Sequence, residues 1–231
     1  MNESLISVLL PVFNGENDIE KAVYSILGQS YKHLELLVID DRSTDSTYKI
    51  CLRISKEDNR VKLFKNQKNL GLTKSLNILI KESKGKYLAR QDSDDSSKET
   101  RLEKQLNFLK NKNIDVVYSR SIRNDTQKII PNFSYYFPLP FVLRFKNPLI
   151  HGTLFAKKSI VENIGGYDEE FIYSQDYKLA FDLIKSGFKL KIMKNVLYES
   201  NFFDNISTNK KKEQKYYAYC ARKGIKPKQI I

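Results

Sequence analysis

Cysteines and long apolar runs are scarce in this chain. Only Cys51 and Cys220 occur among 231 residues, which excludes a disulfide framework and a zinc-finger spacing and predicts two reduced thiols. No apolar run approaches the roughly 18 residues of a membrane span. The opening MNESLISVLLPVF has an early acid and no basic region before its apolar part, so it does not read as a signal peptide. We therefore expect a cytoplasmic protein.

Glycine-rich phosphate loops are also missing. Neither G-x-x-x-x-G-K-[ST] nor G-x-G-x-x-G occurs in the sequence, which argues against a P-loop and a dinucleotide fold of the usual kind. If a nucleotide binds, we expect side chains and a metal ion to hold it.

Positive charge is abundant and unevenly placed. The formal net charge is +13, and from Thr208 to the end eight Lys or Arg stand against Glu213 alone. A basic tail over 208–231 predicts an anionic partner, either a membrane surface or a nucleic acid. A solvated chain end is an equal alternative.

Short apolar runs alternate with segments whose apolar residues have helical spacing. The expected strands cover 7–13, 34–39, 61–64, 87–89 and 116–118. Two further helices are predicted over 159–164 and 177–185, with an irregular aromatic segment over 132–148. This alternation predicts an α/β fold with a Rossmann-like, mainly parallel sheet flanked by helices.

Three polar stretches, PVFNGE, DDRSTD and DSDD, each follow an expected strand. Ligands of parallel sheets bind outside the carboxyl ends of the strands, so we expect the three stretches to form one site. Asp92 and Asp94 have the spacing of a carboxylate pair that suits Mg²⁺ or Mn²⁺ together with substrate phosphates. The alternative is that Asp94, Asp95 and Ser96 only form a turn and cap the next helix.

Several stretches of the sequence resemble one known family. In order, they are PVFNGE, LGQSYKHLELLVIDDRSTDST, KNLGLTKSLNILIKESKGKYLARQDSDD, RLEKQLNFL, HGTLFAKKSI, GGYDEEF and SQDYKLAFDLIKSG. Together they resemble the inverting family 2 glycosyltransferases of the GT-A fold. The resemblance covers roughly residues 7–196 and suits bacterial enzymes that build capsule, lipopolysaccharide or other surface glycans. It implies a nucleotide-sugar-binding half over 1–119, an acceptor-binding and catalytic-base half over 120–207, and the basic tail.

The resemblance also implies roles for individual residues. Phe13 would face the base or ribose, Asp41 would accept a hydrogen bond from the base, and Asp94 would bind the metal ion directly, with Asp92 near the ribose and the metal's waters. The full nucleotide-sugar set is Pro11, Val12, Phe13, Glu16, Asp40, Asp41, Asn69, Gly71, Lys74, Asp92 and Ser93.

Asp176 would be the catalytic base, which takes a proton from an acceptor hydroxyl during a single inverting displacement. The residues alone favour a simple helix cap for Asp176. His151 and Gln175 are candidate acceptor or phosphate contacts, and a structural role for His151 is an equal alternative. The chain departs from the family at Gln175, where Glu is common, and lacks the usual proline before Arg101. Arg90 matches a common family residue without an assigned role.

We therefore expect a metal-dependent transferase that uses a nucleoside-diphosphate sugar, most simply a UDP-sugar, and a saccharide or lipid-linked acceptor. Its place would be the cytoplasm or the inner face of the membrane, which the basic tail would touch. The alternatives are a nucleic-acid-binding protein, suggested by Tyr216, Tyr217 and Tyr219 among the lysines, and a metal-dependent nucleotidyltransferase. We expect no nucleic acid partner.

Overall fold

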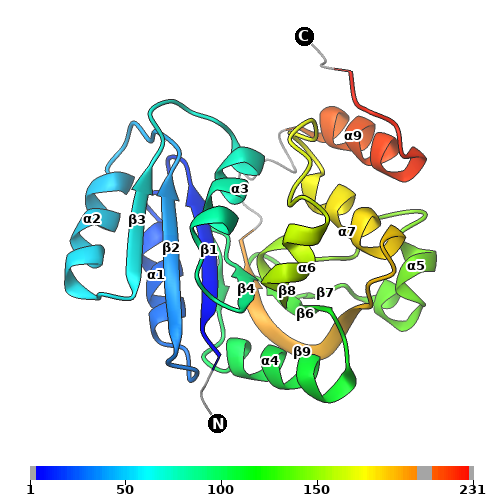
Figure 1. Cartoon of the computed structure of the whole chain (residues 1–231), viewed down its shortest axis with the longest axis horizontal. Coiled ribbons are helices and arrows are strands. Elements are labelled where there is room, and N and C mark those ends of the chain that lie inside the picture. The colour runs from blue at the N-terminus through cyan, green and yellow to red at the C-terminus, as the bar shows by residue number, and fades with distance from the viewer. Residues whose placement is uncertain (1–3, 202–209, 229–231) are drawn as a thin grey trace.

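One sheet with helices on both faces makes up the computed structural model, which describes residues 4–201 and 210–228 (Figure 1). The strands are β1 (Ile6–Val12), β2 (Leu34–Asp40), β3 (Val61–Lys65), β4 (Tyr87–Arg90), β5 (Ser96–Ser97), β6 (Val116–Arg123), β7 (Ile129–Ile130), β8 (Phe155–Lys157) and β9 (Leu190–Ser200). The helices are α1 (Ile19–Leu27), α2 (Thr47–Glu57), α3 (Leu72–Glu82), α4 (Arg101–Lys112), α5 (Leu139–Val142), α6 (Lys158–Asn163), α7 (Gln175–Lys185) and α9 (Lys211–Lys223), with 3₁₀ turns η1 (Phe133–Tyr136) and η2 (His151–Thr153).

The first four long strands form the parallel half of the sheet, in the order β3-β2-β1-β4. Every residue of β1 and β2 is buried, as expected for parallel strands covered by helices on both faces. The register places Val12 opposite Asp40 and Leu9 opposite Arg90. The carboxyl ends of β1, β2 and β4 therefore meet at one edge, as the sequence predicts.

The second half of the sheet is mixed. Strand β8 runs antiparallel between β4 and β6, whereas β9 runs parallel to β6 and carries the short β5 at its far side. Most paired residues still lie in parallel ladders, so the predicted α/β class is confirmed. Strand β9 was not predicted, because its apolar residues alternate with lysines and give no continuous apolar run.

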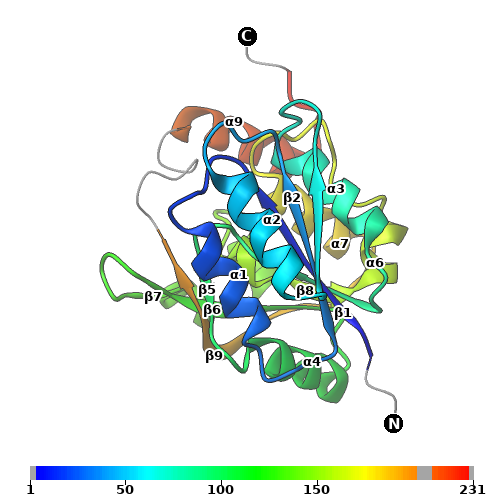
Figure 2. The ribbon, with the colours of Figure 1, turned by 90° about the vertical axis from the view of Figure 1, so that its left-hand side faces the viewer.

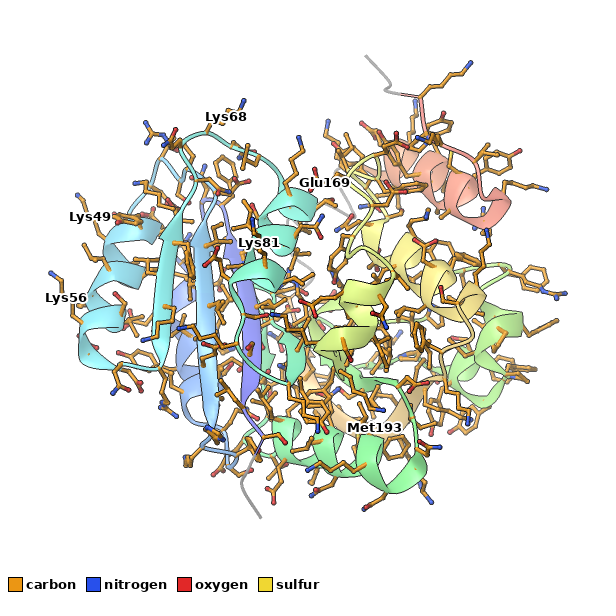
Figure 3. The ribbon with its side chains drawn as sticks, in the orientation of Figure 1. Lys49, Lys56, Lys68, Lys81, Glu169 and Met193 are labelled. Atoms are coloured by element: carbon orange, nitrogen blue, oxygen red, sulfur yellow. The ribbon has the colours of Figure 1, made fainter. Side chains whose placement is uncertain are left out.

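Two apolar cores lie on the two faces of the sheet. Helices α1, α2 and α4 cover one face, and α3, α6 and α7 cover the other. Figure 2 shows α1 and α2 together on one side of the parallel strands. Met193 of β9 belongs to the core under α4 (Figure 3).

Helix α9 packs on the core beside α7, although the sequence predicts a basic tail there. Its Tyr217, Cys220 and Ala221 are buried in the same core as α7, and its lysines face outward. The predicted boundary at residue 207 lies outside the described residues. Within 4–201 and 210–228, no helix is long and apolar enough to cross a membrane.

Candidate active site

The loops that follow β1 and β2 are joined by reciprocal hydrogen bonds. Asn14 Oδ1 accepts from Thr44 N at 2.9 Å, and Glu16 Oε2 accepts from Ser46 N at 2.8 Å. Pro11 and Val12 are buried at the end of β1, whereas Phe13 is 49% exposed. The structure thus leaves an aromatic ring open to solvent at the rim of the site.

Asp41 ties this rim to the loop before α3. Its carboxylate accepts from Asn66 Nδ2 at 2.7 Å, from Leu70 N at 2.8 Å and from Gly71 N at 2.8 Å. Gly71 precedes α3 with φ 83°, a conformation that glycine adopts without strain. Asn69 and Lys74, predicted for the same pocket, are exposed on either side of Gly71.

Asp40 is the more deeply buried of the two neighbouring aspartates. Its Oδ1 accepts from Ser43 N at 3.2 Å, and its Oδ2 has no hydrogen-bond partner in the described structure. Lys65 Nζ lies 3.9 Å from that oxygen. The lysine charge compensates the buried carboxylate in part, and Asp40 supports the loop from below.

The DSDD stretch forms a tight turn directly after β4. Asp92 Oδ1 accepts from Arg90 Nη2 at 2.6 Å, and Asp95 Oδ1 accepts from Asn201 N at 2.6 Å. Asp92 and Asp94 remain partly exposed, with Ser93 between them. The N-cap position of the next helix, α4, is Thr100, and no side chain caps that helix, so the prediction that Asp94, Asp95 and Ser96 cap it is wrong.

Negative charge in this turn is only partly compensated. Burial, followed by the charge of Asp92, raises the pKa of Asp94 to about 6. Burial and the charges of Asp92 and Asp94 also raise the pKa of Asp95 well above its ordinary value. A cation at the turn would relieve this repulsion.

The residues present fit a divalent ion that a substrate helps to hold. In the described ranges, no group of three or more His, Cys, Asp or Glu side chains is arranged to enclose a metal ion. Mg²⁺ is nevertheless often bound by only one or two protein carboxylates, while substrate phosphates and water supply its other ligands. Asp92 and Asp94 meet this requirement.

A buried support beneath the turn escaped the sequence analysis. Arg101 is fully buried and its Nη1 donates to Arg90 O at 2.9 Å and to Gly152 O at 2.5 Å. Tyr198 Oη accepts from Asp92 N at 3.0 Å. A Cβ at Gly152 would lie 2.0 Å from Tyr198 Oη and 2.6 Å from an Asp92 oxygen. The position of Arg101 on the apolar side of α4 could have marked it in the sequence as a buried residue. Tyr198 could not be found in this way, because it lies in β9, the strand that was not predicted.

Asp176 lies in the first turn of α7, where no side chain caps the helix. Its Oδ2 accepts from Asn147 Nδ2 at 2.7 Å, so its interpretation as a simple cap is wrong. Gln175, next to it, is buried. Asn147, which no sequence pattern marked, orients the carboxylate from the loop that follows α5.

His151 and Tyr167 form a pair that senses the charges of both acidic centres. His151 Nε2 lies 2.8 Å from Tyr167 Oη. Burial and the charge of Arg90 lower the pKa of His151, while the charges of Asp176 and Asp92 act in the opposite direction. All three charges also act on Tyr167. The charges of Asp92 and Asp176 therefore both act on the same His–Tyr pair, which includes the predicted His151.

Known proteins resemble this chain in sequence. The family model described as Glycosyl transferase family 2 matches residues 7–165. The chain is 32% identical over 203 residues to the putative glycosyltransferase EpsE of Bacillus subtilis, covering 84% of this chain and 72% of EpsE. It is 28% identical to the Escherichia coli UDP-Glc:alpha-D-GlcNAc-diphosphoundecaprenol beta-1,3-glucosyltransferase WfaP, covering 90% of this chain and 82% of WfaP.

Solved structures share the fold at low identity. S. aureus TarS 1-349 in complex with UDP-GlcNAc superposes with a TM-score of 0.72 at 18% identity, over 87% of this chain and 59% of that chain. The mannosyltransferase PcManGT of Pyrobaculum calidifontis, in complex with GDP-Man and Mn2+, superposes with a TM-score of 0.75 at 20% identity, over 96% and 65%. The chain thus spans less than two thirds of both solved chains.

Proposed function

Because the chain belongs to glycosyltransferase family 2, we propose that it moves a sugar from a nucleoside diphosphate to an acceptor hydroxyl with inversion at the anomeric carbon. Its GT-A fold and its activity as a glycosyltransferase follow from the family. The inverting course, the metal ion, the donor and the acceptor are the proposal.

One observation carries the mechanism. Asp92, which follows β4, and Asp176, at the start of α7, both act electrostatically on the same pair of residues, His151 and Tyr167. A single displacement needs a site for the departing diphosphate and a base for the attacking hydroxyl, on opposite sides of the sugar. These two acidic centres are suited to those two tasks.

Asp176 acts as the base in this proposal. Asn147 donates to one oxygen of its carboxylate and leaves the other to accept the acceptor's proton. On the donor side, Asp94 and Asp92 would hold Mn²⁺ or Mg²⁺, which would supply charge neutralisation for the diphosphate. Phe13 would lie against the nucleoside and Asp41 would accept from the base.

The donor is proposed to be a UDP-sugar, since a solved chain of the same fold binds UDP-GlcNAc. A saccharide or lipid-linked acceptor in surface-glycan synthesis is supported by the name of WfaP, which acts on a diphosphoundecaprenol-linked sugar. The exposed lysines of α9 would then contact the anionic inner face of the membrane. His151 and Gln175 are proposed to face the acceptor or a phosphate.

The experiment that tests the proposal is a release assay over UDP-, GDP- and dTDP-sugars with Mn²⁺ and without acceptor. Slow release of one nucleoside diphosphate would name the donor, and chelation by EDTA should stop it. Release of pyrophosphate from a nucleoside triphosphate and a sugar phosphate would instead identify a nucleotidyltransferase. An oligonucleotide affinity stronger than any nucleotide-sugar affinity would favour nucleic-acid binding.

A further inference from the structure

Five aromatic side chains project into solvent from the segment between β7 and η2. Their exposed fractions range from 43% to 74%, which is unusual for large apolar groups that gather in one place. We call this set the aromatic surface, and it consists of Phe133, Tyr136, Phe137, Phe141 and Phe145.

The aromatic surface is already arranged in the free protein. Phe133 and Phe137 pack edge to face with ring centroids 5.1 Å apart, and Phe141 and Phe145 do so at 5.3 Å. The four rings surround a shallow hollow of about 190 Å³. Beneath them Val142 is buried in the fold, so the rings stand on an ordered base.

Positive charge borders the aromatic surface. No Asp or Glu occurs between residues 126 and 161, whereas Arg144 and Lys146 are exposed beside the rings. Helix α9 adjoins the same place, because Arg222 Nη1 donates to Phe145 O at 3.4 Å. The lysines of α9 that are exposed to solvent are Lys211, Lys212, Lys215 and Lys223.

This surface is also attached to the proposed catalytic base. Tyr177 Oη, on α7, donates to Leu143 O at the end of α5. Asn147, two residues beyond Phe145, holds Asp176. Any partner that bound the aromatic surface would therefore have a defined position relative to the proposed active site.

We propose that the aromatic surface inserts into the headgroup region of an anionic phospholipid bilayer, with Arg144, Lys146 and α9 on the lipid phosphates. Exposed aromatic rings with a basic border are the pattern of interfacial membrane binding, and the missing acidic residues remove the repulsion that would oppose it. The proposal deepens the proposed membrane contact of α9 and makes the rings the inserting part. Vesicle binding is measured without donor or acceptor, so its outcome is separate from sugar transfer.

The test uses the fact that the chain contains no tryptophan. Phe141→Trp in the full chain places a single reporter on the aromatic surface. With vesicles that contain phosphatidylglycerol, we expect a blue shift of its emission and quenching by brominated acyl chains. Tyr24→Trp should show neither, because this residue, 43% exposed, belongs to α1, and Figure 1 shows α1 and α5 on opposite sides of the molecule.

A pair of double variants measures the contribution of the rings. Phe141→Ser/Phe145→Ser should weaken binding to the same vesicles about tenfold or more, since interfacial affinity scales with buried apolar area. Tyr24→Ser/Leu52→Ser removes exposed apolar groups of α1 and α2 and should leave the affinity unchanged. Thermal unfolding of both variants verifies that they are folded.

Three results would overturn the proposal. The first is an absence of vesicle binding by the full chain at low salt. The second is binding that leaves the emission of Phe141→Trp unchanged, which would assign the contact to the lysines alone. The third is an emission shift caused by soluble oligosaccharides and not by vesicles, which would make the hollow a saccharide subsite.

Discussion

Asp176 is held by one neutral side chain, that of Asn147, with 2.7 Å between Oδ2 and Nδ2. An amide donor orients a carboxylate without adding a charge that would oppose proton uptake. Asp94 differs, because its environment is acidic and partly buried. The separate tasks that we propose for these two carboxylates each allow a prediction at the scale of single residues.

Replacing Asp176 with Asn should lower the turnover number by about 10² to 10⁴, the usual contribution of a general base. The nucleotide dissociation constant should stay the same, because Asp176 is proposed to lie on the acceptor side. Steady-state kinetics and calorimetry with the nucleoside diphosphate measure the two effects. Asp182→Asn is the matched control on α7, where Asp182 pairs with Lys178 at 2.6 Å. Equal turnover in the two variants would contradict the assignment.

Binding of Mn²⁺ should weaken at acidic pH. The pKa of Asp94 is raised from 3.8 to about 6, so the carboxyl is largely protonated at pH 5 and largely ionised at pH 7. Since the ion needs the ionised form, its affinity should be about tenfold lower at pH 5 than at pH 7. Titration followed by electron paramagnetic resonance measures this difference. Asp94→Asn should bind weakly at both values, and a pH-independent affinity of the unmodified protein would refute the prediction.

Helix α9 shows how an element can serve two surfaces at once. Tyr217, Cys220 and Ala221 are buried on its inner side, and the ring of Tyr217 packs edge to face on Phe171 and Tyr173. Its outer side carries lysines and Tyr219. A basic sequence is therefore part of the folded core.

Tyr217→Ala should reduce the free energy of unfolding by about 3 to 5 kcal/mol, as expected for removal of a large buried aromatic side chain. Tyr219→Ala, two residues away and 47% exposed, is the control and should change it by less than about 0.5 kcal/mol. Denaturation in urea, followed by circular dichroism, gives both values. If Tyr217→Ala were as stable as the control, α9 would not be packed as described.

At the scale of the whole molecule, the two halves are joined across α3. Asn77 Nδ2 donates to Tyr167 O and Asn77 Oδ1 accepts from Tyr167 N, both at 2.9 Å. The same amide donates to Glu169 Oε1 at 3.0 Å, and Figure 3 shows Glu169 beside α3. Thr73 Oγ1 adds a bond to Phe171 O at 2.9 Å. The segments that these bonds join are thus expected to unfold together.

Asn77→Ala should lower the free energy of unfolding by about 1 to 3 kcal/mol, because backbone groups of Tyr167 lose their partners. Unfolding should remain a single transition. The control is Asn59→Ala, in an exposed turn before β3. Calorimetry distinguishes the outcomes, and two separate transitions in the unmodified protein would show that the halves are independent.

Much of the first half of the chain follows from the sequence. Continuous apolar runs such as LELLVI and SVLLPVF predict buried parallel strands, and this topology alone places PVFNGE, DDRSTD and DSDD at one edge. Asp92 and Asp94 are candidate ligand-binding residues for the same reason, because they directly follow a strand that ends at this edge. The family motifs mark Asp176 without reference to any contact, and its catalytic role stays a prediction.

Only the tertiary structure decides the rest, because it depends on contacts between distant segments. Strand β9 has no continuous apolar run, yet it contributes Tyr198, whose hydroxyl meets Asp92 from 106 residues away. Nothing in the local sequence marks Asn147, and its hydrogen bond to Asp176 forms only because the fold places α7 beside its loop. The basic residues near the end of the chain predict a solvated tail, whereas in the structure Tyr217 is buried in the same core as α7. Local patterns determine the strands, the helices and the edge where the site lies, while the partners that orient and support its side chains are set by packing.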